Sequence, residues 1–304
     1  MKNYAPIVLF VYNRPEHTAK TLTRLSENPI AQESVLYIFS DGPKSSKDQN
    51  KVVDVRSVIN QKWPFKEVNI THRPQNLGLA ANVIDGVTEV IDQHEKAIIL
   101  EDDVLLAPYA LDYFNAALTK YQDNEKVMHI GAYMYNIDRS NLPETFFTRL
   151  TMSQAWATWK QSWGYFEKDI DKLINQFDNR KVENFTFGNT MNFWKQMKLQ
   201  QKGLINSWAV RWYASVFLKE GLALQTTYSL LDNIGHDGTG VHSSISDMFN
   251  TEIQQTKVLY FPDEITENPH AYKAMKTYFK HRKGSLFNRG WRFLINKWHQ
   301  LYQK

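Results

Sequence analysis

Three consecutive carboxylates follow a short apolar run in this chain. Residues 97–104 read Ala-Ile-Ile-Leu-Glu-Asp-Asp-Val, so Glu101, Asp102 and Asp103 come directly after a stretch typical of a buried parallel strand. Ligands of open α/β sheets bind outside the carboxyl ends of such strands. Adjacent carboxylates repel one another, and Mg²⁺ is held by oxygen ligands of this kind. The pattern predicts a cation site, and the alternative is a solvated turn that caps the next helix.

A glycine-rich segment carries candidates for acid–base chemistry. Residues 231–242 read Leu-Asp-Asn-Ile-Gly-His-Asp-Gly-Thr-Gly-Val-His and follow a strand expected at 222–231. Glycines let a backbone approach a ligand closely. Asp237 is the first candidate for a general base, and Asp232, His236 and His242 are the others. His236, ahead of His242, is also a candidate for a metal or phosphate contact. The alternative is a turn whose histidines make structural hydrogen bonds.

The elements that must position these residues alternate between strand and helix in the first half. Apolar runs at 6–12, 35–40, 66–72, 97–103 and 127–133 predict strands, and helical spacing at 15–25, 45–61, 76–94 and from Pro108 onward predicts helices. This alternation implies right-handed βαβ units and a mainly parallel sheet flanked by helices. No linker divides the chain, so we expect one α/β domain over 1–267, with a helical, aromatic-rich second half.

A group of tryptophans is expected in that second half. Helical spacing over 155–166 would place Trp156, Trp159 and Trp163 on one helix face. A buried core stripe is the favoured interpretation, because three large rings on one face indicate burial. Trp156 and Trp159, together with Trp208, are also candidates for stacking on a sugar.

Composition limits the function classes. Hydrophobic residues make up 42% and charged residues 22% of the chain, as in ordinary globular proteins. Cysteine is absent, which excludes disulfides, thiolate chemistry and zinc–thiolate sites. The apolar run at 6–12 is too short to span a membrane and lacks a signal-peptide pattern, so cytoplasmic residence is expected.

The last 37 residues, 268–304, contain no acid but nine basic residues, which leaves residues 1–267 with a net charge of −5. The basic residues alternate with aromatic ones, a pattern that suits an anionic membrane surface. We expect this tail to place the protein on the inner face of the cell membrane, with a packed helix bearing a solvated basic face as the alternative. No nucleic-acid-binding motif is present.

Several nucleotide-binding motifs are missing. The chain has neither the Gly-x-Gly-x-x-Gly fingerprint nor a Walker loop, so it is not expected to be an NAD enzyme or a P-loop ATPase. Asp41 follows the strand at 35–40 and has the chemistry to accept hydrogen bonds from a base or ribose. It would serve equally in a plain Asp-Gly turn.

Four motifs in order resemble the nucleotide-sugar-binding half of a GT-A (Rossmann-like) glycosyltransferase of the family 2 type. They are residues 6–14 (Pro-Ile-Val-Leu-Phe-Val-Tyr-Asn-Arg), 40–42 (Ser-Asp-Gly), 76–82 (Asn-Leu-Gly-Leu-Ala-Ala-Asn) and 98–103 (Ile-Ile-Leu-Glu-Asp-Asp). Residues 99–108 with Tyr113 and Phe114 also resemble the Glu-Asp-Asp segment of N-acetylglucosaminyltransferase I. The resemblance implies a donor-binding half at 1–135 and an acceptor-side half at 136–267.

The resemblance also implies roles for single residues. Asp103 would bind Mn²⁺ or Mg²⁺, Asp102 the ribose or sugar hydroxyls of the donor, and Asp41 its uracil or ribose. The remaining donor-side candidates are Arg14 and Arg73 for the nucleotide or its phosphates, and Asn76, Gly78 and Asn82 for the shape of the neighbouring loop. A helix cap with close packing is the alternative for the last three.

A general base is not evident where the resemblance would place one. Residues 206–212 read Asn-Ser-Trp-Ala-Val-Arg-Trp, and Ala209 and Val210, at the approximate position of the base, cannot accept a proton. An inverting transfer, which the resemblance favours, needs a group that deprotonates the acceptor hydroxyl. The glycine-rich segment therefore supplies the base candidates.

These observations predict an enzyme that moves a sugar from a nucleoside-diphosphate donor, most simply UDP-linked, to a hydroxyl of a glycan or lipid-linked glycan in bacterial surface polysaccharide synthesis. A sugar nucleotidyltransferase is one alternative, although the basic glycine-rich loop for triphosphates is missing. A non-catalytic nucleotide-sugar or glycan-binding module is another, which Ala209 keeps open.

Overall fold

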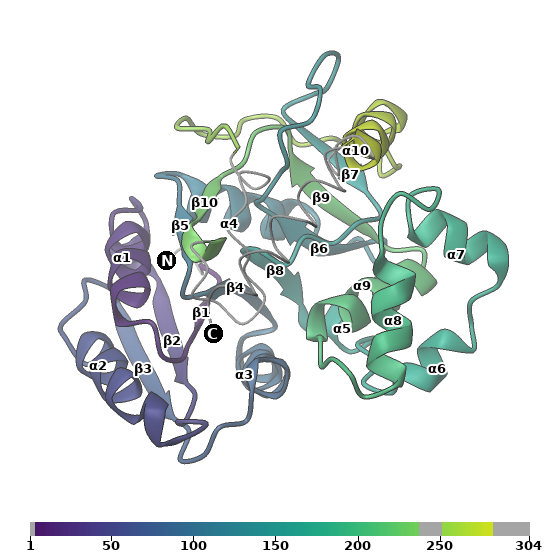
Figure 1. The fold of residues 1–304 in the computed structure, drawn as a ribbon. Coiled ribbons are helices and arrows are strands. Elements are labelled where there is room, and N and C mark those ends of the chain that lie inside the picture. The colour runs from purple at the N-terminus through teal and green to yellow at the C-terminus, as the bar shows by residue number, and fades with distance from the viewer. Residues whose placement is uncertain (1–3, 237–250, 282–304) are drawn as a thin grey trace, which may run out of the picture.

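The computed structural model describes residues 4–236 and 251–281, and its main feature is an eight-stranded sheet with the strand order β3-β2-β1-β4-β8-β6-β9-β7 (Figure 1). The strands are β1 (Ile7–Val11), β2 (Val35–Ser40), β3 (Glu67–His72), β4 (Lys96–Glu101), β6 (Val127–Gly131), β7 (Thr145–Thr148), β8 (Trp156–Trp159) and β9 (Leu222–Thr226). A separate two-stranded ribbon joins β5 (Val104–Leu106) to β10 (Leu231–Asn233). The α/β class expected from the sequence is confirmed.

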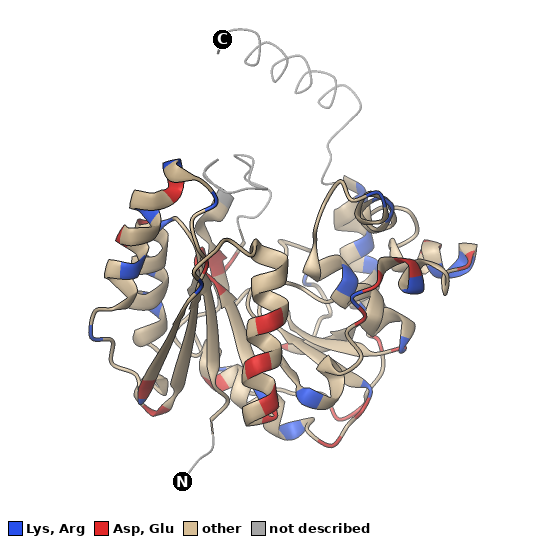
Figure 2. Ribbon diagram, turned by 90° about the horizontal axis from the view of Figure 1, so that it is seen from below, with Lys and Arg blue, Asp and Glu red and all other residues tan. Residues whose placement is uncertain are grey.

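Helices flank the sheet. They are α1 (Pro15–Ser26), α2 (Gln49–Ile59), α3 (Leu79–His94), α4 (Ala110–Lys120), α5 (Lys160–Trp163), α6 (Ile170–Ile174), α7 (Asn179–Phe185), α8 (Phe193–Gln201), α9 (Trp208–Leu218) and α10 (Pro269–His281). Helices α5 to α9 gather at one end of the molecule (Figure 1). Charged positions lie mainly on the helices and loops, and the strands carry few (Figure 2).

The strands β3, β2, β1 and β4 pair in parallel, as the alternating pattern predicts. β1 is buried along its whole length because helices cover both faces. Ile7 and Leu9 pack with the apolar stripes of α1 and α2, whereas Val8 and Phe10 pack with α3 on the other face. The continuous apolar run in the sequence therefore reflects a strand with two buried faces.

The other half of the sheet is mixed, and here the expectation of a helix that carries Trp156 and Trp159 is wrong. These residues bound β8, which lies antiparallel between β4 and β6. A spacing of three residues places side chains on one helix face but on opposite faces of a strand. Accordingly, Trp156 packs in the core on the α3 side and Trp159 in the core on the α1 side.

The strand expected at 222–231 is in fact two strands. β9 ends at Thr226, and β10 begins at Leu231 and leaves the main sheet to pair antiparallel with β5. In that register Asp232 lies opposite Leu105, two residues beyond Asp103. The break at 227–230 thus brings a second-half carboxylate beside the segment that follows the acidic cluster.

The first part of the expected basic tail packs on the domain as α10. Ala271, Met275 and Phe279 are buried on one face, while Lys273 and Lys280 are exposed. Residues 282–304, which hold the rest of the tail, lie outside the described part of the chain. Within residues 4–236 and 251–281, no helix combines the length and apolar character needed to cross a membrane.

Candidate active site

The acidic cluster lies at the switch point of the sheet. After β1, the next two strands along the chain, β2 and β3, are added on one side of β1, whereas β4 pairs on its other side. The loops that leave the carboxyl ends of β1 and β4 therefore separate, and a crevice for ligands forms between them in open α/β sheets. Arg14 follows β1, and Asp102 and Asp103 follow β4, so the two loops present opposite charges to each other.

One arginine nitrogen bridges the two aspartates. Nη2 of Arg14 lies 2.6 Å from Oδ1 of Asp102 and 2.9 Å from Oδ2 of Asp103. The Thr21 hydroxyl donates to the backbone carbonyl of Asp102 at 2.9 Å, and the amide of Tyr12 lies 3.4 Å from its Oδ2. Contacts from the loop after β1 and from α1 thus hold Asp102 in place.

The protonation properties of the cluster follow from burial and from three acids that share one cation. Burial, together with the charges of Asp103 and Asp102, raises the pKa of Glu101 to about 8. Burial also raises the pKa of Asp102 to about 6, against the opposing effect of Arg14. Burial disfavours the charge of Arg14, yet the two aspartates keep its pKa above the ordinary value. With three acids and one arginine, the cluster carries excess negative charge, which favours either a proton or a second cation.

The segment after β10 contacts Asp103. The amide of Ile234 donates to the backbone carbonyl of Asp103 at 2.9 Å. A Cβ atom at Gly235 would overlap Oδ2 of Asp103, so any other residue there would displace the Asp103 carboxylate. The glycine-rich segment therefore reaches the acidic cluster, and Asp232 is its described carboxylate. Asp237, His242 and the side chain of His236 lie outside the described part of the structure.

Asp41 is used within the fold. Its carboxylate accepts hydrogen bonds from the amides of Gly42, Leu77 and Gly78 at 2.8–3.0 Å and from the Asn76 side chain at 3.0 Å. A carboxylate has about four lone-pair positions, and these four bonds occupy them. Asp41 and Asn76 thus join the end of β2 to the loop before α3, where a role in turn formation agrees with the geometry.

Arg73 and Asn82 form a second polar pair at the same edge. Nε of Arg73 donates to Oδ1 of Asn82 at 3.2 Å, and the guanidinium lies 5.2 Å from the ring centre of Phe39. Nη2 of Arg73 is buried and has no hydrogen-bond partner within the described residues. That unused N–H group could donate to an anion. Asn82, which is buried, positions the Arg73 guanidinium.

The three tryptophans considered for sugar stacking are core residues, and for Trp156 and Trp159 this burial agrees with the favoured interpretation. Trp156, Trp208 and Trp159 are 1%, 3% and 8% exposed. Trp156 stacks on Trp208 at 5.2 Å between ring centres, and the indole of Trp159 donates to the carbonyl of Leu118. No face of these three indoles is left for a sugar. The side chain of Trp208 also contacts Glu101, where its hydrogen bond offsets a small part of the rise in the pKa of that carboxyl, and so links α9 to the acidic cluster.

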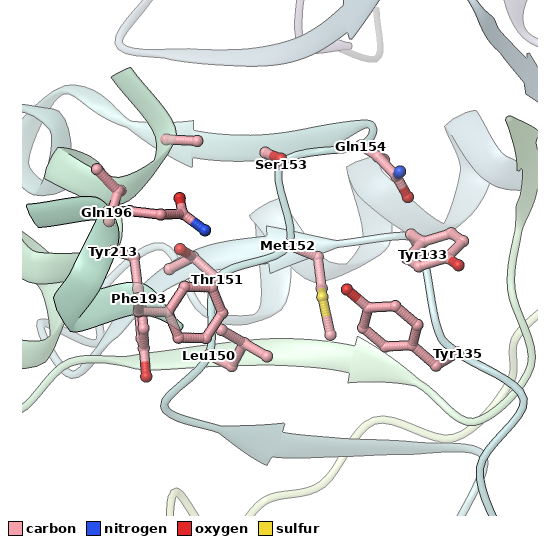
Figure 3. Close-up of a pocket in the computed structure, with 12 residues that line it drawn as sticks. Tyr133, Tyr135, Leu150, Thr151, Met152, Ser153, Gln154, Phe193, Gln196 and Tyr213 are labelled. Atoms are coloured by element: carbon pink, nitrogen blue, oxygen red, sulfur yellow. The ribbon is translucent and has the colours of Figure 1, made fainter. Parts of the chain in front are cut away.

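A cavity of about 240 Å³ beside this core was not predicted (Figure 3). Its lining comes from the segment that follows β6, from residues 150–154, and from helices α8 and α9. The lining residues include Tyr133, Tyr135, Gln154, Phe193, Gln196 and Tyr213. Ala209 also lines it, at the approximate position where the resemblance would place a base. No local sequence motif joins these residues, because they come from four separate segments.

The fold and the site together define an α/β protein with a large, mainly parallel sheet, an arginine–carboxylate cluster at its switch point and a cavity alongside. No family model matches the chain. The chain is similar to an alpha-1,3-mannosyl-glycoprotein 2-beta-N-acetylglucosaminyltransferase of Arabidopsis thaliana, with 24% identity over 140 residues. The match covers 43% of this chain and 31% of that protein, so the chain spans about a third of the length of this glycosyltransferase.

Two solved structures of glycosyltransferases show weaker likeness. The mannosyltransferase PcManGT from Pyrobaculum calidifontis, solved in complex with GDP-Man and Mn²⁺, is 13% identical with a TM-score of 0.40, over 70% of this chain and 74% of that one. TarS of S. aureus is 12% identical with a TM-score of 0.31, over 46% of this chain and 23% of that one. Both TM-scores lie below 0.5.

Proposed function

We propose that the protein is a glycosyltransferase that moves a sugar from a nucleoside-diphosphate donor, UDP-linked, to a hydroxyl of a glycan or lipid-linked glycan. The observation that carries this proposal is the bridge from Arg14 to Asp102 and Asp103 at the switch point of the sheet. The sequence similarity to a plant N-acetylglucosaminyltransferase supports the reaction class.

Arginines supply the positive charge that a departing nucleoside diphosphate needs. Negative charge develops on the diphosphate as the bond to the sugar breaks, and fixed donors aimed at it lower the barrier. Nη1 of Arg14 and Nη2 of Arg73 are buried without hydrogen-bond partners in the described part of the chain. Each guanidinium therefore has an unused donor for a phosphate oxygen, while Asp102 orients Arg14 and accepts from a donor hydroxyl.

The chemistry of the cluster also fits a hard divalent cation. Adjacent carboxylate oxygens suit Mg²⁺ or Mn²⁺, and three acids facing one arginine leave a deficit of positive charge. Asp103 would hold the ion, with His236 as a further ligand. The described residues alone assemble no group of three or more candidate metal ligands. When bound, the cation would act as a Lewis acid on the diphosphate oxygens.

Asp232 is the general base that we propose among the described residues. β10 carries it beside β5, directly beyond Asp103, and its charge contributes to the raised pKa of Tyr133 in the cavity wall, after burial and two neighbouring tyrosines. A carboxylate beside the acidic cluster has the chemistry to deprotonate an acceptor hydroxyl for inverting attack. Asp237 remains the alternative.

The biological setting that we propose is bacterial surface polysaccharide synthesis at the inner face of the cell membrane. The basic and aromatic residues of 282–304 support it, since each cation near an anionic surface adds about 1 kcal/mol of binding free energy.

The test is a thermal-shift screen of nucleotide-sugars with and without Mn²⁺, followed by measurement of UDP release from the best donor. A bound donor raises the melting temperature by mass action. We expect a UDP-sugar to stabilise the protein more strongly with Mn²⁺ and to release UDP slowly, and Asp103→Ala to abolish the metal-dependent part. Unchanged donor affinity in Asp103→Ala would overturn the proposed cation site.

A further inference from the structure

A second cleft lies between the end of β7, helix α7 and the start of α10, and we call it the Arg149 cleft. Its volume of about 360 Å³ falls within the range of about 300–1,000 Å³ typical of small-molecule sites. No sequence motif marks it, because its residues come from three separate parts of the chain. It is lined by Arg149, Asn184, Phe187, Glu267, Pro269 and Tyr272.

The Arg149 cleft is remote from the acidic cluster. Strands β8, β6 and β9 separate β7 from β4 in the sheet. Neighbouring strands are about 4.8 Å apart, so the four steps from β4 to β7 span roughly 19 Å. Figure 1 shows α7 and α10 on the right of the molecule, away from β4, β5 and β10. A small ligand in this cleft therefore does not contact Arg14, Asp102 or Asp103.

Three polar side chains of the lining have unused hydrogen-bonding capacity. Nε of Arg149 lies 3.2 Å from Oε2 of Glu267, while neither Nη atom has a partner among the described residues. Within the same part of the chain, the Asn184 side-chain amide and the Tyr272 hydroxyl are also unpaired. These atoms are open to solvent, and the Arg149 side chain is 44% exposed. They can therefore pair with a ligand that enters the cleft.

Aromatic and proline rings supply the apolar part of the lining. The ring of Phe187 stacks on that of Tyr272, with 5.2 Å between ring centres. Phe187 takes this place with a positive φ of 52°, a conformation that is rare for a bulky residue. Pro269 adds an exposed apolar ring. Apolar rings beside hydroxyl, amide and guanidinium groups match a pyranose ring, which has apolar C–H faces and polar edges.

The charges of the lining balance. Arg149 and Glu267 are the two charged residues that line the described cleft, and they pair with each other. Burial raises the pKa of Glu267 against the effect of Arg149, so the carboxylate charge is already incompletely stabilised. A second anion would be repelled by that carboxylate, and a cation by the Arg149 guanidinium. The cleft therefore favours an uncharged ligand that both donates and accepts hydrogen bonds.

We infer that the Arg149 cleft is a second, non-catalytic carbohydrate site, which binds an uncharged sugar unit far from the place of reaction. The inference rests on the proposed transferase function for the choice of a glycan as ligand, and it adds a holding site to that function. A unit held here is too far from the acidic cluster to react, so it belongs to a distant part of the glycan chain.

The experiment is saturation-transfer NMR and titration with the methyl pyranosides of mannose, galactose, glucose and N-acetylglucosamine. Methyl glucuronide and methyl glucosaminide are the anionic and cationic counterparts. We expect at least one neutral glycoside to bind at millimolar concentration and both charged probes to bind more weakly. Asp103→Ala should leave this affinity unchanged, because the cleft is remote from the acidic cluster.

Three variants test the recognition groups. Arg149→Lys keeps the charge that balances Glu267 but removes the guanidinium fork, and Tyr272→Phe and Asn184→Ala remove groups that are unpaired within the described structure. Each variant should raise the glycoside Kd about fivefold, the effect of one lost hydrogen bond, and should melt close to the wild type. Tyr165→Phe is the matched control, because this tyrosine is 43% exposed and lies outside the cleft. It should leave the Kd unchanged.

The inference is overturned if no neutral glycoside binds, if binding is insensitive to all three cleft variants, or if a charged probe binds as well as the neutral one. It is also overturned if Asp103→Ala weakens glycoside binding as much as the cleft variants do, because the sugar would then lie at the acidic cluster. Failure of the proposed function gives a different result: cleft-dependent glycoside binding would persist while no nucleotide-sugar binds or releases UDP. UDP release without cleft-dependent binding would remove the second site and leave the transferase function in place.

Discussion

Asp41 and the Asp102–Asp103 pair occupy equivalent places in the fold but differ in what their carboxylates do. Each follows a parallel strand of the same sheet, at the edge where ligands bind in this class. Asp41 accepts four hydrogen bonds from residues 42 and 76–78. Asp102 and Asp103 share one nitrogen of Arg14 and lie beside a third acid, so their charges are incompletely balanced.

The difference teaches that a place at a strand end does not by itself make a carboxylate functional. Hydrogen-bond capacity already used within the protein distinguishes a residue that holds the fold from one available to a ligand. His129 belongs with Asp41: its Nδ1 accepts from the indole of Trp212 and its Nε2 donates to the carbonyl of Met152.

The largest expected effect comes from removing the shared cation. Arg14→Met leaves the acids of the cluster without a positive partner, and in EDTA we expect the free energy of unfolding to fall by about 3 kcal/mol in urea titrations. Mn²⁺ should then stabilise this variant more than the wild type, because the ion replaces the lost charge. An equal response of both proteins to Mn²⁺ would argue against a cation site at Asp103.

A surface arginine provides the control for that variant. Arg24 pairs with Glu27 at 2.9 Å, but their side chains are 45% and 53% exposed. Arg24→Met should change the free energy of unfolding by less than about 1 kcal/mol, as is usual for exposed ion pairs.

The next effect is on turnover. Asp103→Asn keeps the shape of the side chain but removes its charge, and we expect UDP release to slow by about 100-fold or more. The urea midpoint should stay close to that of the wild type, because the change also relieves repulsion among the acids. Full activity in Asp103→Asn would place Asp103 with Asp41 as a residue of the fold.

Asp41→Ala tests the other side of the comparison. We expect the free energy of unfolding to fall by about 2 kcal/mol, since three amides and the Asn76 side chain lose their acceptor. The affinity for the donor, measured by titration calorimetry on the folded protein, should not change. A large loss of donor affinity would instead support the predicted contact with uracil or ribose. Asp54→Ala, at an exposed position of α2, is the neutral control.

The smallest effect is a pH dependence from His129. Burial lowers its pKa to about 3, below the ordinary value near 6.5. Between these values the unfolded chain binds the extra proton, so stability falls as the pH drops below about 6.5. The contribution is about 1 kcal/mol between pH 7 and pH 5.5. In urea titrations His129→Gln should flatten this part of the profile, and an unchanged slope would contradict the assignment.

The sequence predicts the parallel half of the sheet well, because its strands are continuous apolar runs with helices between them. It predicts the acidic cluster for the same reason, since Asp102 and Asp103 adjoin the run that forms β4. The pairing of these acids with Arg14 follows from the sequence only if β1 and β4 are assumed to be neighbours in the sheet, as they are in the structure.

The rest depends on contacts that local patterns do not encode. The spacing of Trp156 and Trp159 fits a helix face as well as a strand with two buried faces, and the pairing with β4 and β6 decides between them. The role of Asp41 depends on amides more than 30 residues away along the chain. The cavity is built from four separate segments, so no motif marks it.

The insertion of β8 between β4 and β6 has a consequence for synthesis of the chain. During translation β4 is made first, yet its neighbour on that side, residues 156–159, leaves the ribosome more than 50 residues later. Until then β4 presents an unpaired edge, which is an aggregation hazard in nascent chains. A fragment that stops at residue 135 would keep this exposed edge permanently. Residues 1–135 are therefore continuous in sequence but need residues 136–267 to finish their sheet.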